Sequence, residues 1–214
     1  MENKIETNVI KPPLNFFLKV DGEDKKFELL DNNDETELDS LLLETESFIK
    51  RNSGKDKSEE EKNKLYGDAQ LEWKSYFNKL RSVKYNFFLN RDQWNFLSNL
   101  ILSKLEYDVD TLFFAIELTD MLGSYRSVKF SNDNELKEFK VNATEITYIY
   151  HLIAKHKIKG LTKDAYTFSK ILLRIGDVSK IINYYDTAGK NLSDDIQNWA
   201  AAFEDGVSFD KTSE

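Results

Sequence analysis

The chain contains no cysteine among its 214 residues, and only two histidines, His151 and His156. The first absence excludes disulfide bonds, thiolate nucleophiles and cysteine-ligated zinc or iron–sulfur sites within the chain. Histidines that share a metal on one helix are three or four residues apart, so this pair, five apart, predicts no common metal site. No glycine-rich phosphate loop, Gly-x-Ser-x-Gly elbow or calcium loop occurs. The sequence therefore predicts no catalytic residue, no cofactor and no metal, and favours a non-enzymatic protein.

Carboxylates are the groups on which catalysis or metal binding could still rest. Asp108 and Asp110 could coordinate a divalent ion, but carboxylates beside a helix start usually cap the helix. A carboxylate-based hydrolase would need two or more acids brought together, and the sequence shows no such grouping. A carboxylate-based hydrolase is thus the third hypothesis, after an interaction subunit and a nucleic-acid-associated regulator.

Proline and glycine are also scarce, with two and eight residues against fifteen Phe, ten Tyr and three Trp. This balance favours long regular elements over a sandwich of short strands. The expected fold is mainly α, of the α+β class: a bundle of about six to seven helices with one or two small β-hairpins. No signal peptide and no apolar run long enough to cross a bilayer is recognised, so the expected location is cytoplasmic, or the host cytoplasm or virion if the protein is viral.

The N-terminal quarter of the chain is predicted to form an arm and a small lobe. Residues 1–13 are expected to be an extended arm, which is either a loose terminus or a segment that docks on a partner. Residues 14–52 are expected to form a lobe: a hairpin over 15–30 that turns at Asp21-Gly22, and an acidic helix over 34–51. Between Asp21 and Glu61 the chain holds fifteen acidic and six basic residues. That balance indicates either a solvated face or a docking surface for a basic partner.

Residues 58–206 are predicted to form a helical core domain, and residues 207–214 a flexible tail. Two reciprocal capping pairs, Ser58 with Glu61 and Asn90 with Gln93, predict helices over 58–80 and 90–105, and a third helix is expected over 112–122. The apolar run 83–89 is either a short strand or a link between helices. Alternation over 128–141 favours a second hairpin.

The region from Val141 onward is predicted to be a helical hairpin followed by a last helix. Asn142 and Glu145 form a third capping pair, which predicts a helix from Ala143 that ends at a left-handed Gly160. Thr162 is expected to cap the second helix, with Tyr184-Tyr185-Asp186 at its polar end, and Ser193 is expected to cap a final helix that stops at Gly206. The apolar stripe of the second helix is predicted to comprise Phe168, Leu172, Ile175, Ile182 and Tyr185.

One segment of this acidic protein is basic. From His151 to Lys180 there are seven Lys or Arg and two Asp. The expected turn at Gly160 gives the segment the form of a helix-turn-helix, although any helical hairpin has this form. It is therefore a candidate face for nucleic acid or for an acidic partner protein, and the candidate residues are Lys155, Lys157, Lys159, Lys163, Lys170 and Arg174.

The formal net charge of −8 argues against general binding to nucleic acid or to a membrane surface and favours protein partners. The expected function is a non-enzymatic interaction or structural subunit of a larger, multi-subunit assembly. The Lys-, Asn- and Phe-rich composition suggests a viral or bacteriophage structural or accessory protein. A nucleic-acid-associated regulator that uses the face at 151–180 is the alternative.

Overall fold

The computed structural model describes residues 10–52, 57–103, 116, 128–156, 160 and 162–204. It is mainly helical, and two antiparallel strand pairs place it in the expected α+β class. The chain divides into two compact units. Unit 1 combines Lys11, Asn32–Leu80 and the chain from Asn183, and unit 2 combines Pro12–Asp31 with Arg81–Ile182. Each unit is therefore built from segments distant in sequence, whereas the expected lobes were continuous stretches.

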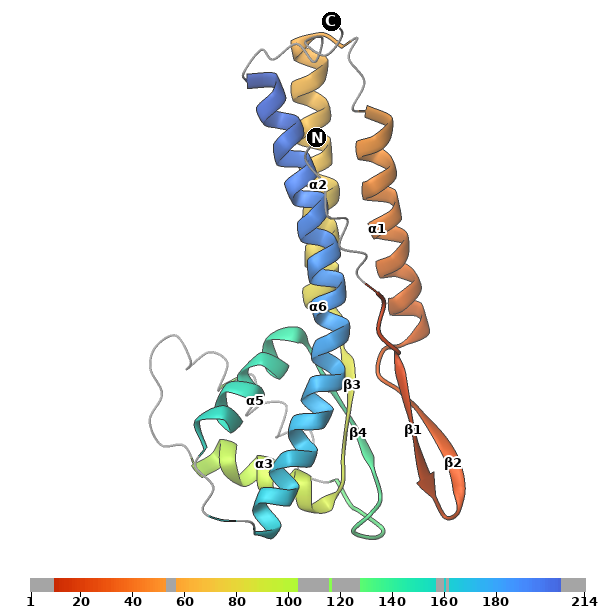
Figure 1. The fold of residues 1–214 in the computed structure, drawn as a ribbon, viewed down its shortest axis with the longest axis vertical. Coiled ribbons are helices and arrows are strands. Elements are labelled where there is room, and N and C mark those ends of the chain that lie inside the picture. Colours follow the sequence, from red (N-terminus) through yellow and green to blue (C-terminus); the bar gives the residue numbers. More distant parts are fainter. Residues whose placement is uncertain are drawn as a thin grey trace, which may run out of the picture. The chain divides into compact units, whose positions relative to one another are not determined.

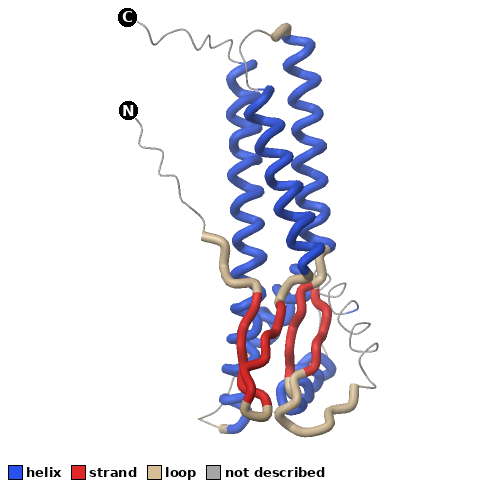
Figure 2. The backbone as a smooth tube through the Cα atoms, turned by 90° about the vertical axis from the view of Figure 1, so that its right-hand side faces the viewer, coloured by secondary structure: helices blue, strands red, loops and turns tan. Residues whose placement is uncertain are grey.

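Unit 1 consists of three helices that lie side by side (Figure 1, Figure 2). They are α1 (Asn32–Asn52), α2 (Glu59–Ser82) and the C-terminal part of α6 (Lys163–Glu204), and α2 runs antiparallel to the other two. The predicted start of α2 is confirmed. Ser58 N–H donates to Glu61 Oε2 at 2.9 Å, and Glu61 N–H donates to Ser58 Oγ at 3.3 Å.

Unit 2 contains two pairs of strands, which Figure 2 shows beside each other. The predicted N-terminal hairpin is confirmed as β1 (Asn15–Val20) and β2 (Glu23–Glu28), and its turn at Asp21-Gly22 has the positive φ angles that Asp-Gly accommodates. The run 83–89 forms a strand, β3 (Tyr85–Leu89), in which every residue is buried.

The second predicted hairpin was wrong in its pairing. β4 (Lys137–Val141) pairs with β3, which lies about fifty residues earlier, so that Tyr85 is opposite Val141. Residues 131–134 are instead bends and turns. They are held by Arg91, which contacts Asp133 Oδ1 at 2.8 Å and donates to the carbonyl of Phe130 at 2.6 Å. The backbone groups of a wholly buried strand need hydrogen-bond partners along its edge. For β3 that partner is β4, which is distant in sequence, so β4 is not available for a local hairpin.

Two further helices complete unit 2 with the first part of α6. They are α3 (Arg91–Ser103) and α5 (Ala143–Lys155), and both predicted capping pairs are present. Asn90 exchanges hydrogen bonds with Gln93 at 2.9 and 3.0 Å, and Asn142 exchanges them with Glu145 at 2.6 and 2.8 Å.

The end of α5 differs from the prediction. Gly160 has a positive φ of 75°, but α5 has already ended at Lys155. His156 is extended there and donates its N–H to the carbonyl of Ile153 at 3.0 Å. Gly160 is therefore a left-handed residue of the connection and does not cap the helix.

The predicted division between the last two helices was also wrong, because α6 is one continuous helix of 42 residues. Thr162 caps its start as expected, with Ala165 N–H donating to Thr162 Oγ1 at 3.3 Å. Tyr185 and Ser193 lie inside the helix, since the residues between them include no proline and only one glycine, Gly189. Ile175 and Tyr185 are buried as predicted, but Ile171 and Ile181 are buried in place of their expected neighbours Leu172 and Ile182.

The described residues form five helices, fewer than the six to seven expected. Fusion of two predicted helices into α6 accounts for part of this difference. The helix expected over 112–122 lies, apart from residue 116, outside the described residues, as do Asp108 and Asp110. Over the part of the chain that is described, no helix combines the length and apolar content that crossing a bilayer requires.

Candidate functional site

The most closely connected polar cluster of unit 1 surrounds Lys11. Its ammonium lies 2.7 Å from Glu35 Oε1 and 2.6 Å from Asp39 Oδ2 on successive turns of α1. The hydroxyl of Tyr185 on α6 donates to the second oxygen of Asp39 at 2.9 Å, and the Lys11 ammonium lies 5.6 Å from the centre of the Tyr185 ring. Tyr76 on α2 completes the cluster by donating to the carbonyl of Tyr185 at 2.6 Å. All three helices of unit 1 therefore meet at these contacts.

Burial and charge pairing set the ionisation of this cluster. Burial raises the pKa of Tyr185 above its usual value; Lys11 opposes this shift and Asp39 adds to it, so the phenol remains a hydrogen-bond donor. Burial of Lys11 opposes its charged form, but hydrogen bonds to Asp39 and Glu35 outweigh that effect and raise its pKa. The cluster therefore holds a permanent ammonium and a neutral phenol at neutral pH.

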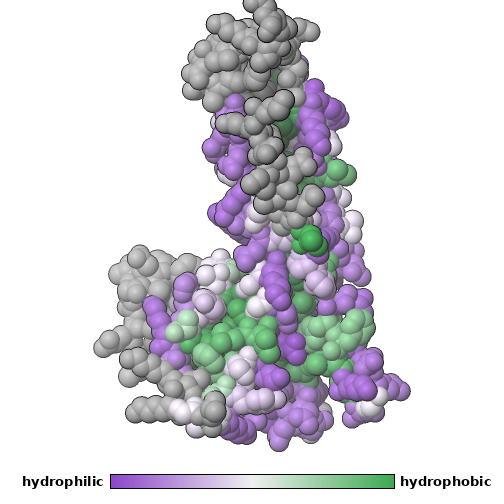
Figure 3. Space-filling view, viewed as in Figure 1, coloured by the Kyte–Doolittle hydropathy of each residue, from purple (hydrophilic) through white to green (hydrophobic). Residues whose placement is uncertain are grey.

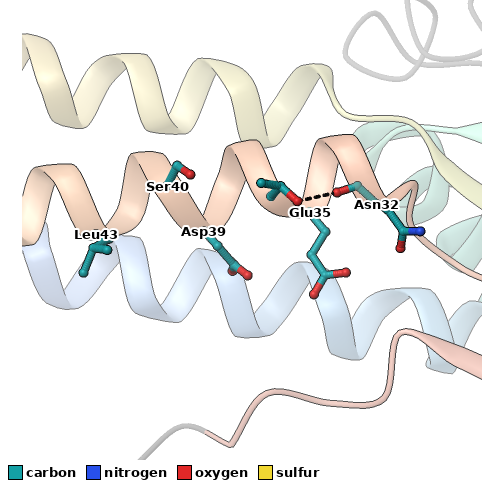
Figure 4. Close-up of a pocket in the computed structure, with 6 residues that line it drawn as sticks. Asn32, Glu35, Asp39, Ser40 and Leu43 are labelled. Atoms are coloured by element: carbon teal, nitrogen blue, oxygen red, sulfur yellow. Dashed lines mark hydrogen bonds between the residues drawn. The ribbon is translucent and has the colours of Figure 1, made fainter.

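A groove of about 440 Å³ lies along α1 beside this cluster. Figure 4 shows Glu35, Asp39 and Leu43 projecting from the same side of the helix. The groove also includes the carbonyl of Asn32, which accepts a hydrogen bond from the Thr36 hydroxyl at 2.7 Å. Two carboxylates face one ammonium, so the groove keeps a negative balance next to an exposed leucine. It is thus suited to a basic and apolar surface.

A second lysine pairs with two further carboxylates of α1. The Lys79 ammonium of α2 lies 2.8 Å from Asp34 Oδ1 and 2.7 Å from Glu37 Oε2. These hydrogen bonds raise the pKa of Lys79 despite its partial burial. Within the acidic stretch from Asp21 to Glu61, interpreted as a solvated face or as a docking surface for a basic partner, the α1 part is therefore paired with lysines of its own chain.

In unit 2 the structure brings three of the six candidate basic residues to one side of α6. Lys163, Lys170 and Arg174 are seven and four residues apart, which aligns them along the helix. Lys155 is exposed at the end of α5, and Lys157 and Lys159 lie outside the described residues. The two histidines have different neighbours, since His151 contacts the ring of Tyr150 and His156 contacts that of Phe96.

The three aligned cations differ in what they contact. Arg174 is largely covered: its guanidinium carbon lies 4.0 Å from the ring centre of Phe16 on β1, and Asp177 is 3.5 Å away. Burial lowers the pKa of Arg174 from its usual value, and Asp177 opposes that shift. Lys163 pairs with Asp92 at 2.9 Å, and the Lys170 ammonium lies 5.2 Å from the ring centre of Tyr166. Arg174 therefore supports the hairpin, while the lysines remain at the surface.

Exposed apolar side chains accompany these lysines. Tyr166 and Leu173 are 65% and 59% exposed and lie seven residues apart on α6, on either side of Lys170. On the face drawn in Figure 3, hydrophobic residues gather over unit 2, whereas the helices of unit 1 present mostly hydrophilic ones. We call the face of α6 formed by Lys163, Tyr166, Lys170 and Leu173 the α6 strip.

Sequence reasoning missed the Lys11 cluster, because its members are separated by up to about 170 positions and only the fold brings them together. The adjacent Pro12-Pro13, which makes the segment after Lys11 extended, was the available signal. Within the described ranges, no three His, Asp or Glu side chains are grouped closely enough to hold a metal ion. No family model matches this chain, and no match was found among curated proteins or among solved structures.

Proposed function

We propose that the protein is a non-enzymatic interaction subunit of a larger assembly, and that the α6 strip is one of its contact surfaces. The observation that carries this proposal is the pair of exposed side chains, Tyr166 and Leu173, that alternate with Lys163 and Lys170 on one side of a helix. Apolar residues scattered singly over a surface are ordinary, but an aligned pair within a charged frame resembles the centre and rim of a protein interface. Tyrosine is also among the residues enriched at interface centres.

The covered position of Arg174 supports a protein partner over nucleic acid. A phosphate-binding face needs cations free to reach the backbone of the nucleic acid, and the Arg174 side chain is only 18% exposed, with its guanidinium packed on Phe16. Lys163 pairs with Asp92 but remains exposed, so of the three aligned cations only Arg174 is covered. The nucleic-acid role of the 151–180 face stays a prediction, and it requires a salt-sensitive mobility shift that disappears when Lys155, Lys163 and Lys170 are changed to Glu.

The proposal is tested by measuring the mass of the tagged chain in an extract of its natural source and again after purification. We expect a mass above that of the 25.0 kDa chain in the extract. A variant with Tyr166→Glu and Leu173→Glu should lose this assembly, whereas Leu71→Glu, at a leucine of α2 that is 66% exposed, should retain it. A lone monomer in both conditions contradicts the proposal.

A further inference from the structure

Two helix faces of this chain are complementary in charge, and both carry exposed apolar side chains. The α6 strip places Lys170 between the exposed Tyr166 and Leu173. The groove on α1 places the carboxylates of Glu35 and Asp39 beside Leu43, which is 62% exposed. One face is thus basic with apolar residues, and the other is acidic with an apolar residue.

The α1 groove already binds a lysine ammonium, that of Lys11, through both carboxylates. Glu35 and Asp39 nevertheless keep 28% and 44% of their side-chain surface exposed. A carboxylate pair offers more acceptor positions than one ammonium and one phenol use. The groove therefore has both the chemistry to hold a lysine and accessible oxygen atoms for a second one.

We infer that these two faces bind each other between copies of the chain, with the α6 strip of one copy seated on the α1 groove of a second copy. The inference rests on the proposed function and names the partner of that same strip. Lys170 would face Glu35 and Asp39, and the apolar contact would join Tyr166 and Leu173 to Leu43. A second copy of the chain is the partner we favour over another acidic protein. Each copy carries both the basic strip and the acidic groove, so every strip has a complementary groove present at the same concentration.

The strip and the groove are different surfaces, so a copy that uses its strip has a second face, its groove, that can take part in a further contact. Association through both faces gives either a closed dimer with two reciprocal contacts or a longer head-to-tail series. A strip that paired with another strip would instead bring Lys170 against a second Lys170, which like-charge repulsion disfavours. Loss of association when either face alone is altered therefore distinguishes a strip-to-groove contact from a strip-to-strip contact.

The inference is tested by changing the charge of each face separately and measuring sedimentation of the purified full chain. The groove variant carries Ser40→Lys and Leu43→Lys, and the strip variant carries Lys170→Glu and Leu173→Glu; all four positions lie outside the Lys11 cluster. We expect the unaltered chain to show a mass that rises with concentration. Each variant alone should lose at least about tenfold in association constant, because like charges then face each other.

Mixing the two variants should restore association, since the unaltered strip of one then meets the unaltered groove of the other. A Leu71→Lys chain is the matched control and should associate like the unaltered chain, and circular dichroism should show equal helix content in all of them. A strip-to-strip contact would leave the groove variant associated and would overturn the inference. A monomeric unaltered chain would also overturn it, while a different protein captured through the strip in the extract would leave the proposed function standing.

Discussion

Helix α1 of unit 1 and the core helices of unit 2 are stabilised by different means. In unit 2, all five residues of β3 are buried, and α5 places Ile146, Ile149 and Ile153 in the same core. In unit 1, residues 32–51 of α1 contribute only Leu38 and Thr45 as buried side chains. The α1 helix is held instead by the ion pairs of Lys11 and Lys79. The comparison indicates that apolar burial holds the helices of unit 2, whereas α1 depends on a few directed contacts, although α2 and α6 of its own unit bury Tyr76, Leu80 and Ile196.

The largest expected effect is on the core of unit 2. Phe139 is 1% exposed and stacks on Trp94 with ring centres 4.5 Å apart. Phe139→Ala should cost about 3–5 kcal/mol of unfolding free energy, because it removes a large buried ring and leaves a cavity. Chemical denaturation checks the magnitude, and hydrogen exchange should show the greatest loss of protection in β3 and β4.

Leu43→Ala is the control for that experiment, since Leu43 is 62% exposed and its truncation should change the unfolding free energy by less than about 0.5 kcal/mol. A cost below about 1 kcal/mol for Phe139→Ala would contradict the view that the core dominates unit 2.

A smaller effect is expected where helices of unit 1 approach closely. A Cβ added at Gly189 of α6 would lie 2.5 Å from the Tyr76 ring and 2.7 Å from the Phe77 ring, both of α2. Gly189→Ala should therefore destabilise by about 1–3 kcal/mol through overpacking, although alanine favours the helix.

Gly67 of α2 is the matched control in the same unit. A Cβ at this position meets nothing within 4 Å, so Gly67→Ala should stabilise the chain by about 0.5–1 kcal/mol. Urea unfolding of both variants measures the difference, and stabilisation by Gly189→Ala would show that α2 and α6 do not pack this closely.

The smallest effect is expected from the Lys11 contacts. Lys11→Met should cost about 0.5–1 kcal/mol, because the pairs to Glu35 and Asp39 are partly exposed. Folding raises the pKa of Lys11, so its stabilisation is fully present below the pKa of an unfolded lysine and is lost as the pH rises through the folded value. The cost should thus stay constant from about pH 6 to about pH 10 and decrease in stronger alkali.

Lys190→Met removes a comparable ammonium from an exposed pair with Asp186 on α6 and should cost less than about 0.5 kcal/mol. Denaturation series at several pH values compare the two variants. Equal costs would mean that Lys11 stabilises unit 1 no more than an ordinary surface pair does.

Local signals in the sequence predicted the starts of helices and the first hairpin. Each reciprocal cap joins residues three positions apart, as with Asn142 and Glu145, so its hydrogen bonds form whatever the rest of the fold does. Asp21-Gly22 acts in the same local way by accepting positive φ angles. Two other expected boundaries failed: Gly160, expected at a helix end, and Ser193, expected at a helix start, have suitable residue types but do not act as caps.

By itself, then, the sequence determined the helical character of the chain, its capping residues and the separation of acidic from basic segments. Only the tertiary structure decided that β3 pairs with a distant strand, that α6 continues through Tyr185, and that Lys11 meets Asp39. The physical reason is how far apart in the sequence the interacting residues lie. Caps and turns depend on neighbouring residues, whereas strand pairing, helix length and buried polar contacts depend on which distant surfaces remain to be covered.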